Sequence, residues 1–167
     1  VGRNAPKYQT DTDEDRFRRG IYVIWRRSAP YPSFVNFDAP DRAACVVSRS
    51  RTNTPLQALT LMNNKAYVEM SWALARRIAT EPKEMSDRER VIWAWRNTMG
   101  RAPKKSEADY LLGVYARQLE RFTSDTAAAK KLIDKQPLPD NIKQEQLAAW
   151  FYVANILLNL DETISKS

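Results

Sequence analysis

The chain of 167 residues contains no histidine and a single cysteine, Cys45. Histidine is the commonest metal ligand and a frequent general base, so Ser-His-Asp and Cys-His catalytic arrangements are excluded, as are His/Cys zinc sites and c-type haem attachment. One cysteine cannot form an intrachain disulfide. Catalysis by this chain alone would need carboxylates, lysine, tyrosine or serine.

Glycine is scarce and long apolar runs are missing. The four glycines form neither a GxGxxG pattern nor a P-loop, which excludes a phosphate-cradling nucleotide site. No run of about 18 apolar residues is present, so we expect no membrane insertion. The first ten residues lack the pattern of a signal peptide and resemble the middle of a chain. We therefore expect the sequence to be part of a longer protein.

The composition is that of a folded, basic domain. Hydrophobic residues make up 43%, with five Trp, seven Tyr and five Phe, which is enough for a core. The net charge of +7 is compatible with a polyanion partner, but charges of both signs alternate along the helical segments, as on a solvated surface. Arginines interleaved with aromatics before residue 52 could line a nucleic-acid groove. No known nucleic-acid module accompanies them, so nucleic acid is not the favoured partner.

The first 54 residues hold four of the nine prolines and one predicted helix. Apolar residues recur at helical spacing from Phe17 to Trp25, which predicts a helix over Asp13 to Arg27. Its subsegment IYVIW is also compatible with a short strand, because β-branched and aromatic residues crowd it. The segment that follows is rich in proline and aromatics and is expected to be an extended, packed connection.

After residue 54 the sequence has the signals of a helical bundle. Thr54-Pro55 is a typical N-cap and N1 pair, and Ser86 to Glu89 forms a capping box for a helix that Gly100 ends. Further helices are predicted over 65–80, 105–122, 127–135 and 141–160, the last with an apolar surface wide enough for a central helix. We predict one all-α domain of about six helices in an irregular bundle (55–167), with an extended proline-rich N-terminal arm (1–54) belonging to it.

Three features with the residue types of chemical sites have structural explanations. The acidic run from Asp11 to Asp15 fails as a calcium loop after its fifth position and suits a helix start. Asp38 and Asp41 flank Ala39-Pro40, where carboxylates usually cap turns; a catalytic pair is the less favoured reading. Cys45 lies between alanines and valines, so we expect it to be buried and inert.

Several motifs resemble a known family. They are FDAPDR and RTNTPLQAL in the first half, and WRNTMGRAP and LLNLDE later on. The chain resembles, over about residues 16–160, the C-terminal domain of unknown function in large planctomycete proteins that often also carry a planctomycete-type cytochrome c domain. It departs from the family pattern at Asn64-Lys65 and Lys104-Lys105, where Asp-Pro and Thr-Pro are usual. Asn64 can still cap a helix, whereas the lysine at 104 cannot.

The resemblance implies an exported, extracytoplasmic multi-domain protein, but no haem site and no established activity, so no cofactor is expected here. The leading hypothesis is a non-catalytic interaction and scaffolding module that packs against upstream domains of its own chain. The alternative is an accessory wall of a polysaccharide- or polyanion-processing enzyme whose catalytic residues lie upstream. An anionic glycan or a cytochrome domain is a possible further partner. The interaction candidates are Trp25, Phe37, Asp38, Arg42, Arg49, Arg51, Asn53 and Gln57.

Overall fold

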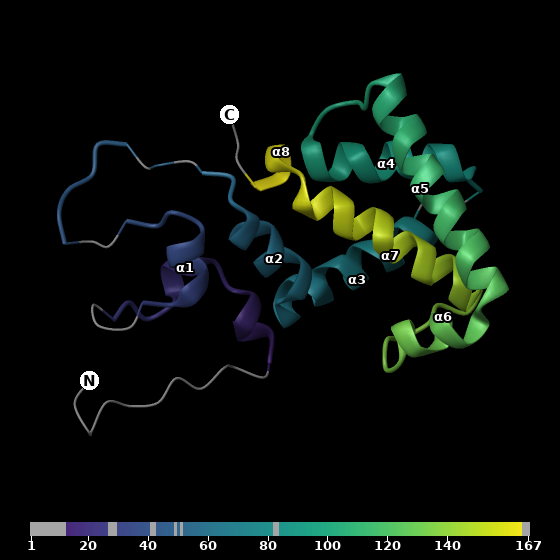
Figure 1. The fold of residues 1–167 in the computed structure, drawn as a ribbon, viewed down its shortest axis with the longest axis horizontal. Helices are drawn as coiled ribbons and strands as arrows, with labels where there is room; N and C mark the ends of the chain where they lie inside the picture. Colours follow the sequence, from purple (N-terminus) through teal and green to yellow (C-terminus); the bar gives the residue numbers. More distant parts are fainter. Residues whose placement is uncertain are drawn as a thin grey trace. The chain divides into compact units, whose positions relative to one another are not determined.

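The computed structural model describes residues 13–26, 30–40, 43–48, 50, 52–81 and 84–164. Within these ranges the protein is all-α, with eight α-helices, six of them eight residues or longer, and no strands (Figure 1). The predicted fold class is therefore confirmed. The chain divides into two compact units, Val1–Thr60 and Leu61–Ser167, so that helix α2 (Pro55–Asn63) contributes to both. The predicted arm, Cys45 and all eight interaction candidates fall within the residue range of the first unit.

The described part of the first unit begins with two short 3₁₀ helices, η1 (Glu14–Phe17) and η2 (Gly20–Tyr22). The predicted continuous helix from Asp13 is wrong, because Arg18 and Arg19 between these elements have extended backbone angles. Asp13 does cap the first element, accepting a hydrogen bond from the backbone N–H of Asp15 at 3.1 Å. The alternative of a strand in IYVIW is also wrong within the described part of this segment.

A tertiary contact at Gly20 explains the break. A Cβ added there would lie only 2.7 Å from Cε1 of Phe34, so the bare glycine lets this ring approach the backbone. Phe34 belongs to α1 (Pro32–Asn36), a single helical turn with proline at its first position. This helix lies in the segment for which we expected only an extended connection.

The second unit is built around one long helix. Figure 1 shows α7 running through the middle of this unit. It packs against α3, α5 and α6 and, less extensively, against α4 and α8, which confirms the prediction of a central last helix. The elements are α3 (Lys65–Thr80), α4 (Asp87–Met99), α5 (Lys105–Ser124), α6 (Thr126–Ile133), α7 (Gln144–Asn159) and α8 (Asp161–Ile164).

Aromatic stacking on both sides of α7 organises the core of this unit. Trp150 stacks on Tyr115 of α5 with ring centroids 3.9 Å apart, and Phe151 stacks on Trp72 of α3 at 4.2 Å. Burial raises the pKa of the Tyr115 hydroxyl. Helical spacing on α3 predicts Ala66, Met70, Ala73 and Leu74 as its inward face; Leu74 is buried, but Met70 is exposed and Trp72 is buried instead.

The helix ends follow the predicted capping chemistry. Asn64 caps α3 by accepting from the Ala66 N–H at 3.0 Å, and Ser86 and Glu89 form the predicted capping box of α4. Gly100 ends α4 with a φ of 74°, which glycine adopts without strain. The side chain of Lys104 makes no cap at α5, as expected.

Two further observations concern exposure and hydrophobicity. Cys45 is exposed, so the prediction of a buried cysteine is wrong. Flanking alanines and valines are a weak guide to burial in a segment without a helix or strand that would give them a common buried face.

Among the described residues, no helix is both long and apolar enough to cross a membrane.

Candidate functional site

A polar network joins two of the sequence motifs within the first unit. One carboxylate oxygen of Asp38, in FDAPDR, accepts hydrogen bonds from the backbone N–H of Thr52 at 2.9 Å and from its hydroxyl at 2.7 Å. The side-chain amide nitrogen of Gln57, Nε2, donates to the same Thr52 hydroxyl at 3.0 Å. Thr52 and Gln57 both belong to RTNTPLQAL, so the network ties this motif to the turn that follows α1.

The same glutamine closes a capping box at the start of α2. The backbone N–H of Thr54 donates to Oε1 of Gln57 at 3.1 Å, and the Gln57 N–H donates to the Thr54 hydroxyl at 3.2 Å. The Thr54 hydroxyl is therefore the predicted N-cap, with Gln57 at the third helical position as its reciprocal partner. The T-x-x-Q spacing was available in the sequence, but sequence reasoning used only Thr54-Pro55.

A second link connects α1 with α2. The side-chain amide of Asn36 donates to the Thr60 hydroxyl at 3.0 Å, and that hydroxyl donates to the backbone carbonyl of Leu56 at 2.8 Å. Asn36 and Asp38, the sequence neighbours of Phe37, thus bond to Thr60 within α2 and to Thr52 just before it. We call the hydrogen bonds among Asp38, Thr52, Thr54 and Gln57 the clamp; within it Asp38 is an acceptor for Thr52.

Aromatic side chains pack beside this clamp in the first unit. Trp25 stacks on Phe34 with ring centroids 5.4 Å apart, and Tyr31 meets Phe34 edge-on at 5.6 Å. Trp25 and Phe37 are only half-buried. Their partly exposed rings suit residues that support a surface from behind rather than form its outermost layer.

Other interaction candidates predicted from the sequence either take no part in this hydrogen-bond network or lie outside the described residues. Asn53 is exposed and takes no part in the hydrogen bonds that join Asp38, Thr52 and Gln57. Arg42, Arg49 and Arg51 lie outside the described residues, as does Asp41. Within the part of the chain that the structure covers, no group of three or more His, Cys, Asp or Glu side chains could hold a metal ion.

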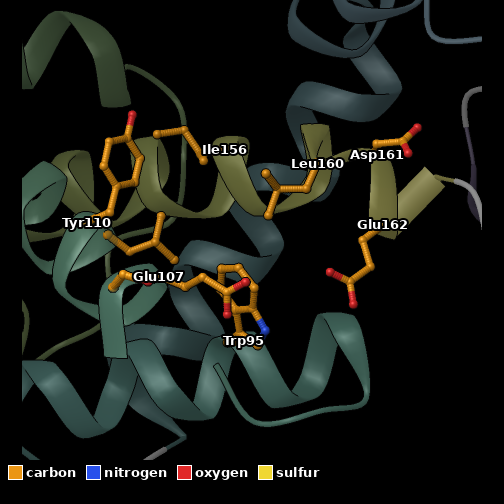
Figure 2. A pocket seen from close by; sticks show the side chains of 9 residues that line it. Trp95, Glu107, Tyr110, Ile156, Leu160, Asp161 and Glu162 are labelled. Carbon is orange, nitrogen blue, oxygen red and sulfur yellow. The ribbon is translucent and has the colours of Figure 1, made fainter. Parts of the chain in front are cut away.

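The second unit has a groove of about 540 Å³ that sequence reasoning missed. Figure 2 shows the labelled side chains around it, with Tyr110 beside Ile156 and the carboxyl groups of Glu107 and Glu162 directed toward the same space above Trp95. The lining comes from α4, α5, α7 and α8 and consists of Trp95, Ser106, Glu107, Tyr110, Leu111, Ile156, Leu160, Asp161 and Glu162. The floor of the groove is therefore apolar, whereas its edge is acidic.

Arg101 connects the two glutamates at the edge of the groove. Its guanidinium forms a bidentate pair with Glu107 at 2.9 Å for both bonds and a second one with Glu162 at 2.6 and 2.7 Å. The guanidinium carbon also lies 5.0 Å from the ring centroid of Trp95, a cation–π distance. These bonds join the motif WRNTMGRAP to the motif LLNLDE. The sequence did not predict this contact, because the two motifs are far apart along the chain.

The ion pairs keep both glutamates charged. The hydrogen bonds from Arg101, with one from the backbone N–H of Lys104, lower the pKa of Glu107 to about 2 from its ordinary 4.5. The bonds from Arg101 also lower the pKa of Glu162. Neither glutamate therefore suits a general acid near neutral pH, which needs a raised pKa.

The comparisons with known proteins agree with part of the resemblance. A model of the family PSD1, described as a protein of unknown function (DUF1553), matches residues 2–115. No curated protein and no solved structure matches the chain. The matched range includes the Asp38 network and the pair of Arg101 with Glu107, whereas Glu162 lies beyond it.

Proposed function

Since the chain belongs to the DUF1553 family, whose description assigns no activity, we propose a function from the surface of its first unit. The chain is a non-catalytic helical interaction module that packs against other domains of a larger exported protein. The observation that carries this proposal is the contrast in burial between the two units.

Among the described residues of the first unit, many apolar side chains are exposed and none is fully buried. Among its residues whose burial the structure describes, Gln57 alone is buried, and the 23 buried hydrophobic residues all belong to the second unit. Nine of its large hydrophobic side chains are exposed: Phe17, Ile21, Tyr22, Ile24, Val35, Val46, Val47, Leu56 and Leu59. Removal of such surface from water is favourable, and exposed apolar patches typically mark interaction sites.

The expected contact residues are the exposed side chains next to Trp25. Ile21 is 71% exposed and Ile24 is 68% exposed, beside the half-buried Trp25. The hydrogen bonds of Asp38 and Gln57 fix the backbone that precedes α2. The exposed apolar surface of the first unit is therefore formed before a partner binds. Preorganisation of this kind lowers the entropic cost of association.

The resemblance to large planctomycete proteins suggests where this domain acts. Large planctomycete proteins that carry a similar domain, often with a planctomycete-type cytochrome c domain, are exported and multi-domain, so the expected partner is an upstream domain of the same chain. The polyanion alternative receives no support from the second unit. There, the conspicuous arginine of the groove, Arg101, is already held by two carboxylates.

Calorimetry tests the proposal directly. The chain of residues 1–167 is titrated with the separately purified remainder of its natural protein at two salt concentrations. We expect a dissociation constant of about 1 μM or tighter, in the range of stable domain contacts. Ile24→Asp should weaken it by at least about tenfold, because a charge would replace an apolar contact residue.

Leu138→Asp is the matched control, since Leu138 is an exposed apolar residue of the second unit. It should leave the affinity unchanged. A chain that is folded by circular dichroism but does not associate would contradict the proposal. Equal weakening by both substitutions would also contradict it, because the contact would then not lie on the first unit.

A further inference from the structure

The groove of the second unit combines features that select one class of ligand. Its floor is apolar, with Leu111, Ile156, Leu160 and Trp95 among the residues that line it. Tyr110 stands at one side with 61% of its surface exposed, which is high for an aromatic residue beside an apolar floor. A concavity of about 540 Å³ lies within the range of specific ligand sites.

The hydrogen bonds of Arg101 show that the groove does not suit an anion. Nε donates to Glu162, one terminal nitrogen donates to Glu107 and to the Ala102 carbonyl, and the other donates to Glu107 and Glu162. A guanidinium has five N–H donors, and all five are used. An incoming phosphate, sulfate or carboxylate would have to displace these ion pairs.

The carboxylates at the edge instead favour a cation. Glu107, Asp161 and Glu162 line the groove, and the cations whose charge acts on Glu107 and Glu162 are Arg101 and Lys104. Among these five described side chains, three carboxylates face two cations. The carboxylate oxygens that bind Arg101 retain lone pairs that can accept a further N–H, and the Tyr110 ring offers a face for a cation–π contact.

We propose that this groove binds a basic segment of a partner polypeptide, whose apolar side chains cover Leu111, Ile156 and Leu160 while a lysine or arginine reaches the acidic edge. The groove is open to solvent along the exposed Tyr110 ring, so a chain can enter and leave it. A long aliphatic stem ending in a cation matches an apolar floor with a carboxylate edge. The site lies wholly in the second unit and does not depend on the function proposed for the first.

Nuclear magnetic resonance of the ¹⁵N-labelled chain tests this site. The probes are three peptides, acetyl-ALKLA-amide, acetyl-ALQLA-amide and acetyl-ALELA-amide, together with n-hexylammonium. We expect the lysine peptide to shift the indole resonance of Trp95 and the amides of Tyr110 and Glu162. Its affinity should exceed that of the glutamine peptide at least about threefold, the effect of one exposed ion pair, and the glutamate peptide should bind weakest.

Two substitutions at the groove and one elsewhere complete the test. Tyr110→Ala and Asp161→Asn should each weaken binding of the lysine peptide, because they remove an exposed aromatic face and an exposed carboxylate. Asp140→Asn, at another exposed carboxylate, should not. Heteronuclear spectra with unchanged dispersion would show that each variant is folded.

Several results would overturn the proposal. These are equal affinity for the three peptides, shifts that map away from the groove, and no shift up to about 10 mM peptide, which is weaker than any specific peptide site. Binding of n-hexylammonium as tight as that of the lysine peptide would identify a small-amine site and would exclude a polypeptide occupant.

Discussion

At the scale of single residues, Asp38 explains why two sequence motifs occur together. It adopts a φ of 55°, a conformation that aspartate and asparagine tolerate better than other non-glycine residues. From this position one oxygen receives both the N–H and the hydroxyl of Thr52, fourteen residues further along. The motif residue is therefore an acceptor that connects two stretches of irregular chain, and no hydrophobic period in the sequence predicts such a connection.

We predict that Asp38→Ala loosens the clamp. The substitution removes the acceptor for two hydrogen bonds and puts alanine at a positive φ. The amide of Thr52 should exchange with solvent at least about tenfold faster, which corresponds to a loss of about 1.4 kcal/mol. Asp38→Asn keeps an acceptor oxygen and should have a smaller effect. Hydrogen exchange read by NMR is the measurement, and an unchanged Thr52 rate in the alanine variant would refute the clamp.

At the scale of helices, the sequence predicted elements whose ends are encoded locally. The capping box at Ser86 and the glycine at position 100 specify both ends of α4, and both were confirmed. The helix predicted over Asp13 to Arg27 was wrong because its structure depends on a distant contact. Its apolar residues do recur at helical spacing, but Gly20 lies close to the ring of Phe34, which belongs to the later helix α1.

The candidate sites were less predictable than the helices, for a related reason. Asp38 and Gln57 were among the predicted interaction candidates, yet Thr52, which forms hydrogen bonds with both, was not. The pairing of Arg101 with Glu162 spans 61 residues and depends on the packing of α8 against α7 and α4. Local pattern indicates which residues are unusual, whereas the tertiary fold decides which of them meet.

Two glycine substitutions should shift stability in opposite directions. Gly113→Ala places a Cβ within α5, 3.4 Å from the flexible end of Arg117, and should raise the free energy of unfolding by about 0.5–1 kcal/mol. Gly100→Ala forces alanine to a φ of 74° and should lower it by roughly 1 kcal/mol. Urea denaturation followed by tryptophan fluorescence gives both values. A Gly100→Ala variant as stable as the parent would show that the end of α4 readily adopts another conformation.

The Arg101 pairs should make stability depend on pH. The pKa of Glu107 is lowered to about 2 in the folded state from an ordinary 4.5, and that of Glu162 is also lowered. A lowered folded-state pKa stabilises the fold above the unfolded value, and this contribution is lost as the pH falls toward the folded value. The contribution of Arg101 is thus complete above about pH 5 and disappears toward about pH 2.

Melting temperatures of the parent and Arg101→Gln, measured across this range, test that dependence. The difference between the two proteins should be largest near neutral pH and should shrink as the pH falls. Lys131→Gln, at an exposed lysine, serves as the charge control and should show no such convergence. A constant difference between the parent and Arg101→Gln at all pH values would mean that packing of Arg101 on Trp95 matters and the ion pairs do not.

At the scale of the whole molecule, apolar burial is concentrated in the second unit. That unit has a continuous core around α7, with Leu147, Val153 and Leu157 fully buried. The first unit is held by the Asp38 and Gln57 hydrogen bonds and by aromatic contacts around Phe34, while most of its described large aliphatic side chains are exposed. Hydrogen bonds contribute little net stability compared with a core, so the first unit gains most from a partner that covers it.

We propose that another domain of the same protein covers the first unit. Hydrogen exchange by mass spectrometry, comparing residues 1–167 alone with the full-length protein, measures this coverage. We predict that peptides from 13–26 and 43–48 exchange at least about tenfold more slowly in the full-length protein, while peptides from α7 stay unchanged. Equal exchange of the first unit in both proteins would contradict the claim, because no domain would then be covering its exposed apolar residues.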